Sequence, residues 1–189
     1  PASELHVMQS KSGGSSHASS QLTLERDGTN YLQFMTANNG TSGLLFGDVA
    51  DNDGTAIKYD HNTSLMLFNT EASERLRITT SGLQVTGNQT NNIVAMGAND
   101  VDCSAGSYFT KTITGATTFT FSNVPSGVEF SFTMEITLNG SNAITWPSSV
   151  KWNADTAPAL TDGKTQLFMF VTTNGGTRFR GSALVDYVN

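Results

Sequence analysis

The sequence predicts an all-β protein, and composition, turn spacing and one long alternating stretch support that prediction. Only 14% of the residues are charged, and 18 of the 189 residues are glycine. This composition disfavours long solvated helices with charged faces. Short runs of alternating apolar and polar residues recur along the chain between turn signals such as Asp27-Gly28 and Asn39-Gly40, which is typical of β-strands joined by tight turns.

The stretch Val128–Leu138, which reads V-E-F-S-F-T-M-E-I-T-L, is expected to anchor the largest sheet. Its apolar residues occupy every second position, and polar residues occupy the positions between them. This period of two indicates a strand with one buried face. We expect a long antiparallel strand, roughly 36 Å in length.

Residues 1–92 are predicted to form a β-meander of short strands. Such strands carry too little apolar surface for a core of their own, because small cores are marginal even when complete. Three chains around a common axis would bury these faces and cover the strand edges. We therefore expect a trimeric shaft, a β-meander or β-prism. Its predicted strands are Leu5–Met8, Leu22–Glu25, Tyr31–Met35, Leu44–Phe46, Ala56–Asp60, Leu65–Phe68, Leu76–Ile78 and Leu83–Thr86.

Residues 93–189 are predicted to form an antiparallel, jelly-roll-like β-sandwich, the head. Both tryptophans and most phenylalanines lie here. Asn139-Gly140 predicts a hairpin that joins the long strand to Ala143–Trp146. Leu167–Val171 is apolar at every position, which predicts a central strand covered on both faces. The predicted strands are Tyr108–Ile113, Thr117–Phe121, Val128–Leu138, Ala143–Trp146, Thr165–Thr173 and Thr177–Leu184.

Charge and hydropathy argue against two classes of partner. The chain has 10 basic and 16 acidic residues, a net charge of -6 and no basic run, so we expect no nucleic-acid partner. Its longest apolar run, Leu167–Val171, is far too short for a membrane span, so we expect a soluble protein without membrane insertion. The single Cys103 is expected to be a packed thiol. The chain begins at Pro1, which suggests a fragment or processed product with an attachment segment upstream.

Part of the predicted head resembles the C-terminal domain of many bacteriophage tail fibres. The resemblance rests on Ile144–Trp152 (I-T-W-P-S-S-V-K-W), Ala157–Thr161, and Phe168–Thr177 with Gly181. Two departures stand out. Asn153-Ala154-Asp155 replaces a Pro-Gly-Gly-like step, and Arg178-Phe179-Arg180 replaces an aromatic pair.

A second stretch resembles the shaft repeats that precede such domains, namely Ser73–Ile78 and Gly82–Gly87, together with Tyr59–Asn62 and Phe68-Asn69. The resemblance implies a homotrimer at the periphery of the virion tail. Such a fibre contacts a polysaccharide or protein receptor on the host cell surface, and joins upstream tail proteins through a preceding N-terminal region.

Catalysis is not expected, and we predict neither catalytic residues nor a cofactor. The chain has no G-x-S-x-G motif, and no histidine lies in the same half as Cys103. Glycan hydrolysis requires two carboxylates about 5 to 9.5 Å apart. Glu129 and Glu135 would lie roughly 20 Å apart on one strand, which leaves Asp100 with Asp102 as a minor alternative.

No metal site is expected either. The segment Asp51–Gly54 resembles part of a calcium-binding loop in its acidic residues and glycine. If Gly54 were the sixth residue of an EF-hand loop, however, Val49 would be the first, where a carboxylate is required, so a turn is the better interpretation. A lone histidine on a three-fold axis could bind one metal ion through three imidazoles. His6, His17 and His61 are candidates, but we expect solvated side chains.

The predicted receptor contacts are mainly polar residues in loops, since loops on a rigid scaffold carry recognition. A tryptophan could stack on a sugar ring, although a core role is favoured, more strongly for Trp146 than for Trp152. Two other classes compete with a receptor-binding fibre: a structural shaft or decoration protein of the virion, and a polysaccharide-degrading tailspike. The predicted contact residues are Asn153, Asp155, Trp152, Arg178 and Arg180.

Overall fold

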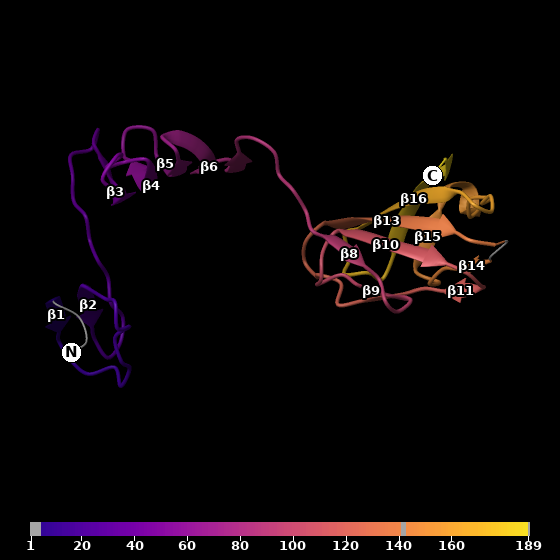
Figure 1. Ribbon diagram of the computed structural model, residues 1–189, viewed down its shortest axis with the longest axis horizontal. Helices are drawn as coiled ribbons and strands as arrows, with labels where there is room; N and C mark the ends of the chain where they lie inside the picture. Colours follow the sequence, from indigo (N-terminus) through magenta and orange to yellow (C-terminus); the bar gives the residue numbers. More distant parts are fainter. Residues whose placement is uncertain (1–4, 141–142, 189) are drawn as a thin grey trace. The chain divides into compact units, whose positions relative to one another are not determined.

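The structure is a computed structural model that describes residues 5–140 and 143–188. It divides into an N-terminal unit, Pro1–Asn88, and a C-terminal unit, Gln89–Asn189 (Figure 1). The described residues form strands and one short 3-10 helix, η1 (Asn153–Asp155), which confirms the all-β class. No helix in this described part is long and apolar enough to cross a membrane.

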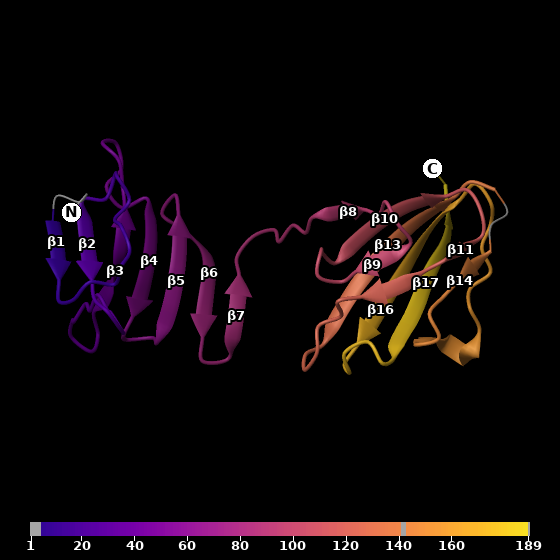
Figure 2. The ribbon, with the colours of Figure 1, turned by 90° about the horizontal axis from the view of Figure 1, so that it is seen from below.

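The N-terminal unit contains an antiparallel meander of five strands in one layer (Figure 2). The meander prediction is confirmed for these strands. They are β3 (Thr41–Phe46), β4 (Thr55–Asp60), β5 (Leu65–Thr70), β6 (Ser73–Thr79) and β7 (Gly82–Val85).

The meander prediction is wrong for the first strands of the unit. Strands β1 (Leu5–Met8) and β2 (Leu22–Glu25) occur where expected but pair in parallel. The segment between them is long enough for the crossover that parallel pairing requires. The predicted strand Tyr31–Met35 is irregular, with Tyr31 82% and Met35 86% exposed.

Strand pairing sorts the side chains of the five-stranded sheet onto two unlike faces. One face, called the apolar face below, is mainly apolar in every strand, with Ser42, Thr55 and Thr70 as polar members. The opposite face is mixed, with polar side chains such as Lys58, Arg77 and Gln84 beside the leucines Leu45, Leu65 and Leu67. The apolar face consists of Ser42, Leu44, Phe46, Thr55, Ile57, Tyr59, Met66, Phe68, Thr70, Leu76, Ile78, Leu83 and Val85.

The C-terminal unit is built on a six-stranded mixed sheet, which two short parallel ladders cover on one face (Figures 1 and 2). The ladders pair β9 (Asp100–Asp102) with β12 (Thr120–Ser122), and β11 (Thr117–Thr118) with β14 (Ile144–Thr145). The strand order in the sheet is β15 (Val150–Trp152), β17 (Phe179–Tyr187), β16 (Thr165–Thr172), β13 (Phe130–Leu138), β10 (Tyr108–Ile113) and β8 (Ile93–Ala95).

The core lies between the sheet and the ladders and is rich in aromatic rings. The ring of Phe121 lies 5.0 to 5.2 Å from those of Phe132, Phe170 and Phe179, in edge-on geometry. Such pairs stabilise a core beyond the area they bury. Cys103 is also buried, as predicted, and burial raises the pKa of its thiol to about 12.

The expected antiparallel pairing is wrong for several strands of this unit, and the jelly-roll arrangement stays a prediction. Strand β13 is antiparallel to β16 but parallel to β10, and β14 pairs with β11 rather than with β13. No hairpin to β14 forms at Asn139-Gly140, since both edges of β13 are already occupied. At its end, Asn139 N donates to Ile113 O, while Leu138 O accepts from Gly163 N.

The prediction that Leu167–Val171 is covered on both faces is also wrong. Its inward residues Phe168 and Phe170 are buried, whereas Met169 between them is 41% exposed. The ladders cover only the inner face of the sheet. The alternate residues of this strand, Leu167, Met169 and Val171, therefore lie on the outer face, which is open to solvent.

Candidate binding surface

The outer face of the six-stranded sheet carries a mixture of hydroxyl, apolar and cationic side chains. In β13 the inward positions are apolar and the outward positions are Ser131, Thr133, Glu135 and Thr137. The register brings Ser131, Val171 and Arg180 into one row across three strands. It also aligns Thr133, Met169 and Ser182 in the next row.

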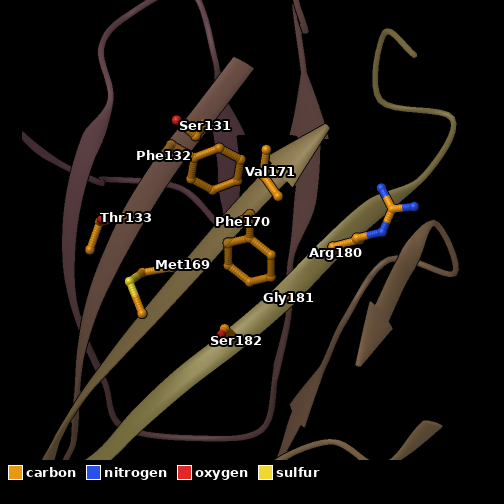
Figure 3. Close-up of a pocket in the computed structure, with 9 residues that line it drawn as sticks. All are labelled: Ser131, Phe132, Thr133, Met169, Phe170, Val171, Arg180, Gly181 and Ser182. Atoms are coloured by element: carbon orange, nitrogen blue, oxygen red, sulfur yellow. The ribbon is translucent and has the colours of Figure 1, made fainter. Parts of the chain in front are cut away.

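These two rows enclose a shallow groove of about 470 Å³ over β13, β16 and β17 (Figure 3). Met169 and Val171 supply its apolar surface, and three hydroxyls stand on the flanking strands. Arg180 adds a guanidinium with several donors at one end. The lining residues are Ser131, Phe132, Thr133, Met169, Phe170, Val171, Arg180, Gly181 and Ser182.

The Arg180 end of the groove is cationic. Arg180 is exposed, and among the described residues we find no ion pair that neutralises it. Lys151 lies directly opposite in the β15–β17 register and is also exposed, with its Nζ 3.0 Å from Ser148 O. In a chain of net charge -6, these neighbouring cations create a local site that attracts anions over about a Debye length.

A second hollow of about 420 Å³ continues along the same face over β8, β10 and β13. It shares Thr133 with the groove and is also lined by Tyr108 and Glu135. Tyr108 Oη donates to Glu135 Oε2 at 2.5 Å. This bond to a carboxylate, helped by burial, raises the pKa of Tyr108 to about 12. The phenol therefore stays protonated at physiological pH and holds Glu135 in place.

Of the predicted contact residues, Arg180 alone lines the groove. Trp152 lies on the inner side of the sheet, where its ring packs 5.4 Å from Trp146 and 5.7 Å from Phe170. Gly181 makes this packing possible, because a Cβ there would lie 2.8 Å from Cζ3 of Trp152. Trp152 and Arg180 thus point to opposite faces of one sheet.

The other three predicted residues are exposed but lie outside the groove. Asn153 and Asp155 belong to η1, which follows β15 and contacts β17. Arg178 precedes β17 in a turn, where its backbone N donates to Asn174 Oδ1 at 3.1 Å. None of them is brought next to Arg180 by the strand register.

The sequence reasoning missed the residues that surround Arg180 in the groove. The alternation in Val128–Leu138 did indicate that Ser131 and Thr133 lie on the exposed face of a half-buried strand. Nothing in the local sequence indicated which strands would flank them, however, and the site depends on that pairing. The missed residues are Ser131, Thr133, Met169, Val171 and Ser182.

The carboxylates considered for glycan cleavage form part of a hydrogen-bonded ladder. Asp100 accepts from Thr120 Oγ1 at 2.6 Å and from Ser122 Oγ. Hydrogen bonds from Ser104 and Asn123 lower the pKa of Asp102. A glycosidase general acid needs the opposite shift. These bonds tie both carboxylates to the β9–β12 region.

The possible metal-binding residues are held in local contacts. In the Asp48–Gly54 loop, the Asp48 carboxylate accepts from the backbone N of Ala50 and Asp51, which lowers its pKa. His61 Nε2 lies 3.1 Å from Ser42 Oγ, and His17 Nδ1 accepts from Ser19 N. The side chain of His6 lies outside the described residues. Among those that are described, no group of three metal-ligating side chains comes together.

Comparisons with protein-family models, with curated protein sequences and with solved structures gave no match for this chain.

Proposed function

We propose that this chain is the distal region of a bacteriophage tail fibre, which attaches the virion to the surface of a host bacterium as a homotrimer. Residues 1–92 form the trimeric shaft, and residues 93–189 form the head at the tail periphery. The observation that carries the attachment role is the open groove beside Arg180, which combines an apolar surface, hydroxyls and a cation. The identity as a tail fibre rests on the sequence resemblance of residues 144–181.

The chemistry of the groove favours an acidic glycan of the bacterial surface as receptor. Met169 and Val171 can contact the apolar face of a sugar ring, while Ser131, Thr133 and Ser182 can exchange hydrogen bonds with its hydroxyls. The Arg180 guanidinium can form a paired hydrogen bond to a carboxylate or phosphate on the glycan. A shallow, open site of this kind supports binding of a repeating polymer along its length.

Binding without cleavage is the expected outcome at this surface. Glu135, which lines the neighbouring hollow, is held by Tyr108 Oη. A retaining or inverting glycosidase needs two carboxylates on opposite sides of the scissile bond. The lining of the groove contains no carboxylate.

The proposal is tested with fluorescently labelled full chain, applied to a panel of bacterial strains and to surface polysaccharides purified from the strains that bind it. Arg180→Ala should lower the apparent affinity about tenfold or more, since it removes a charged hydrogen-bond donor. Arg178→Ala is the matched control, because it removes the same charge two residues away and outside the groove. Its binding should remain within about twofold of the unaltered chain.

Other outcomes would point to the competing classes. A chain that binds no strain and leaves phage adsorption unchanged when present in excess would indicate a structural shaft or decoration protein. New reducing ends released from a bound polysaccharide would indicate a tailspike enzyme.

A further inference from the structure

The apolar face of the β3–β7 sheet is the largest unexplained feature of the N-terminal unit. Two cross-strand rows dominate it: Leu44–Ile57–Phe68–Leu76–Val85 and Ser42–Tyr59–Met66–Ile78–Leu83. The more exposed apolar members range from 37% for Met66 to 64% for Leu83. Five adjacent strands thus present a continuous apolar surface.

A sheet of this kind needs a second layer. The apolar face of a sheet stabilises the fold only when it is removed from water, which requires another element or another chain to pack against it. Of the described apolar residues in the N-terminal unit, only Ala56 is buried. The unit therefore has the apolar half of a core without the layer that would complete it.

The opposite face already has the character of a solvent-facing surface. Arg77 makes two hydrogen bonds to the Glu74 carboxylate, at 2.6 and 2.7 Å, and Lys58, Asp60 and Gln84 are polar. The leucines on this face, Leu45, Leu65 and Leu67, are interspersed with these polar residues and form no continuous apolar surface. Partner binding is thus expected on one face only, and the alternation of the strands determines which one.

A copy of the same face is a fitting partner. The apolar face contains no charged side chain, so two copies can meet without burying an unpaired charge. If each apolar side chain of this face buries on the order of 70 Å² of surface, the face as a whole buries about 700 Å² per subunit. This area is close to the roughly 800 Å² per partner of a standard protein–protein interface.

We propose that the apolar face of β3–β7 is the surface through which copies of this chain associate, with three such faces turned toward a common axis. The inference rests on the proposed homotrimer for the number of copies, and it is independent of receptor binding. Each copy supplies the layer that the others lack, so the shaft acquires its core on assembly.

The first test compares two neighbouring residues of β7 that are both exposed in the single chain but lie on opposite faces, Leu83 and Gln84. Light scattering on the unaltered chain should give a mass near three times 20.1 kDa. Leu83→Asp places a charge in the interface and should lower the mass to that of one chain at the same concentration. Gln84→Asp adds the same charge to the polar face and should leave the trimer intact.

A second test does not depend on disrupting the assembly. Leu83→Cys should be cross-linked between chains by a short bis-maleimide, whereas Gln84→Cys should remain largely uncross-linked. The native Cys103 gives little background, because it is 4% exposed. Tryptophan fluorescence, which reports Trp146 and Trp152, confirms that the C-terminal unit stays folded in every variant.

Four results would overturn the inference: a monomeric unaltered chain, a dimer in place of the trimer, a trimer unaffected by Leu83→Asp, or equal cross-linking at both positions. A chain that trimerises through this face but binds no bacterial strain would instead refute the attachment function and leave the inference standing. The two proposals therefore fail separately.

Discussion

Gly181 shows how one missing side chain determines the packing of a whole region. Its position in β17 faces the aromatic cluster, where a Cβ would lie 2.8 Å from Trp152 Cζ3 and 3.2 Å from Phe170 Cε1. Gly181 is thus required for close approach. Only a residue without a side chain lets the Trp152 ring approach β17 this closely.

Replacement of Gly181 by Ala should destabilise the C-terminal unit by about 1–3 kcal/mol, since the neighbouring rings cannot move without disturbing the core. Urea unfolding followed by tryptophan fluorescence measures the change. Gly97→Ala serves as the control, because a Cβ at Gly97 meets no atom within 4 Å. We expect its effect to stay within about 0.5 kcal/mol, and equal effects at both positions would contradict the packing argument.

The Tyr108–Glu135 hydrogen bond is expected to make the stability of the C-terminal unit depend on pH in the alkaline range. The folded state raises the pKa of Tyr108 from 10.0 to about 12, so it keeps a proton that the unfolded chain releases. The stability from this bond is complete below pH 10 and is lost as the pH rises from about 10 to about 12. Glu135→Gln should return the pKa of Tyr108 toward 10, because it removes the hydrogen bond to the carboxylate, the main cause of the shift, and also the charge that repels the phenolate.

Near-ultraviolet phenolate absorbance measures this titration. The spectrum of Tyr108→Phe, subtracted at each pH, removes the signals of the other tyrosines. A pKa that stays near 12 in Glu135→Gln would show that burial, rather than the carboxylate, causes the shift.

At the scale of elements, β13 organises the C-terminal unit through its inward residues. Phe132 is 3% exposed, and its ring lies within 6.0 Å of those of Phe109, Phe121, Phe170 and Phe179. Phe132→Ala should lower the free energy of unfolding by about 3–5 kcal/mol, because it leaves a cavity among rings from several strands.

Urea unfolding also tests this prediction, with Thr133→Ala as the matched control. Thr133 follows Phe132 in the same strand but lies on the outer face, so its replacement should change stability by less than about 1 kcal/mol. If Phe132→Ala costs no more than Thr133→Ala, the assignment of the two faces is wrong.

The elements also show the limit of local sequence patterns. The bounds of β1, β2 and β10 agree with the alternation of their residues. The hairpin prediction at Asn139-Gly140 failed, even though Gly140 does adopt the positive φ of a turn, at 106°. A turn signal defines where a strand ends, but the occupied edges of β13 determine which strand can pair next.

At the scale of the whole molecule, the two units should differ in how they depend on concentration. The C-terminal unit has a core of its own, while the N-terminal sheet has an uncovered apolar face. Association stabilises only the structure that forms the interface, by mass action. Thermal unfolding should therefore show one transition that shifts with concentration and one that does not.

Circular dichroism follows both units, and tryptophan fluorescence follows the C-terminal unit alone. A tenfold dilution should lower the midpoint of the N-terminal transition by several degrees, while the fluorescence transition stays constant. A single transition independent of concentration would argue against assembly through the N-terminal sheet.

The sequence by itself determined the all-β class and the side of β13 that faces inward. These properties follow from composition and from a period of two, both of which are local. Only the tertiary structure decided the partners and directions of the strands, such as β13 beside both β10 and β16. The groove depends on that decision, because Ser131, Val171 and Arg180 come from three separate strands. Pairing between distant strands is selected by competition for free edges and by burial in a shared core. Neither the competition for free edges nor the burial in a shared core can be read from a single segment of the chain.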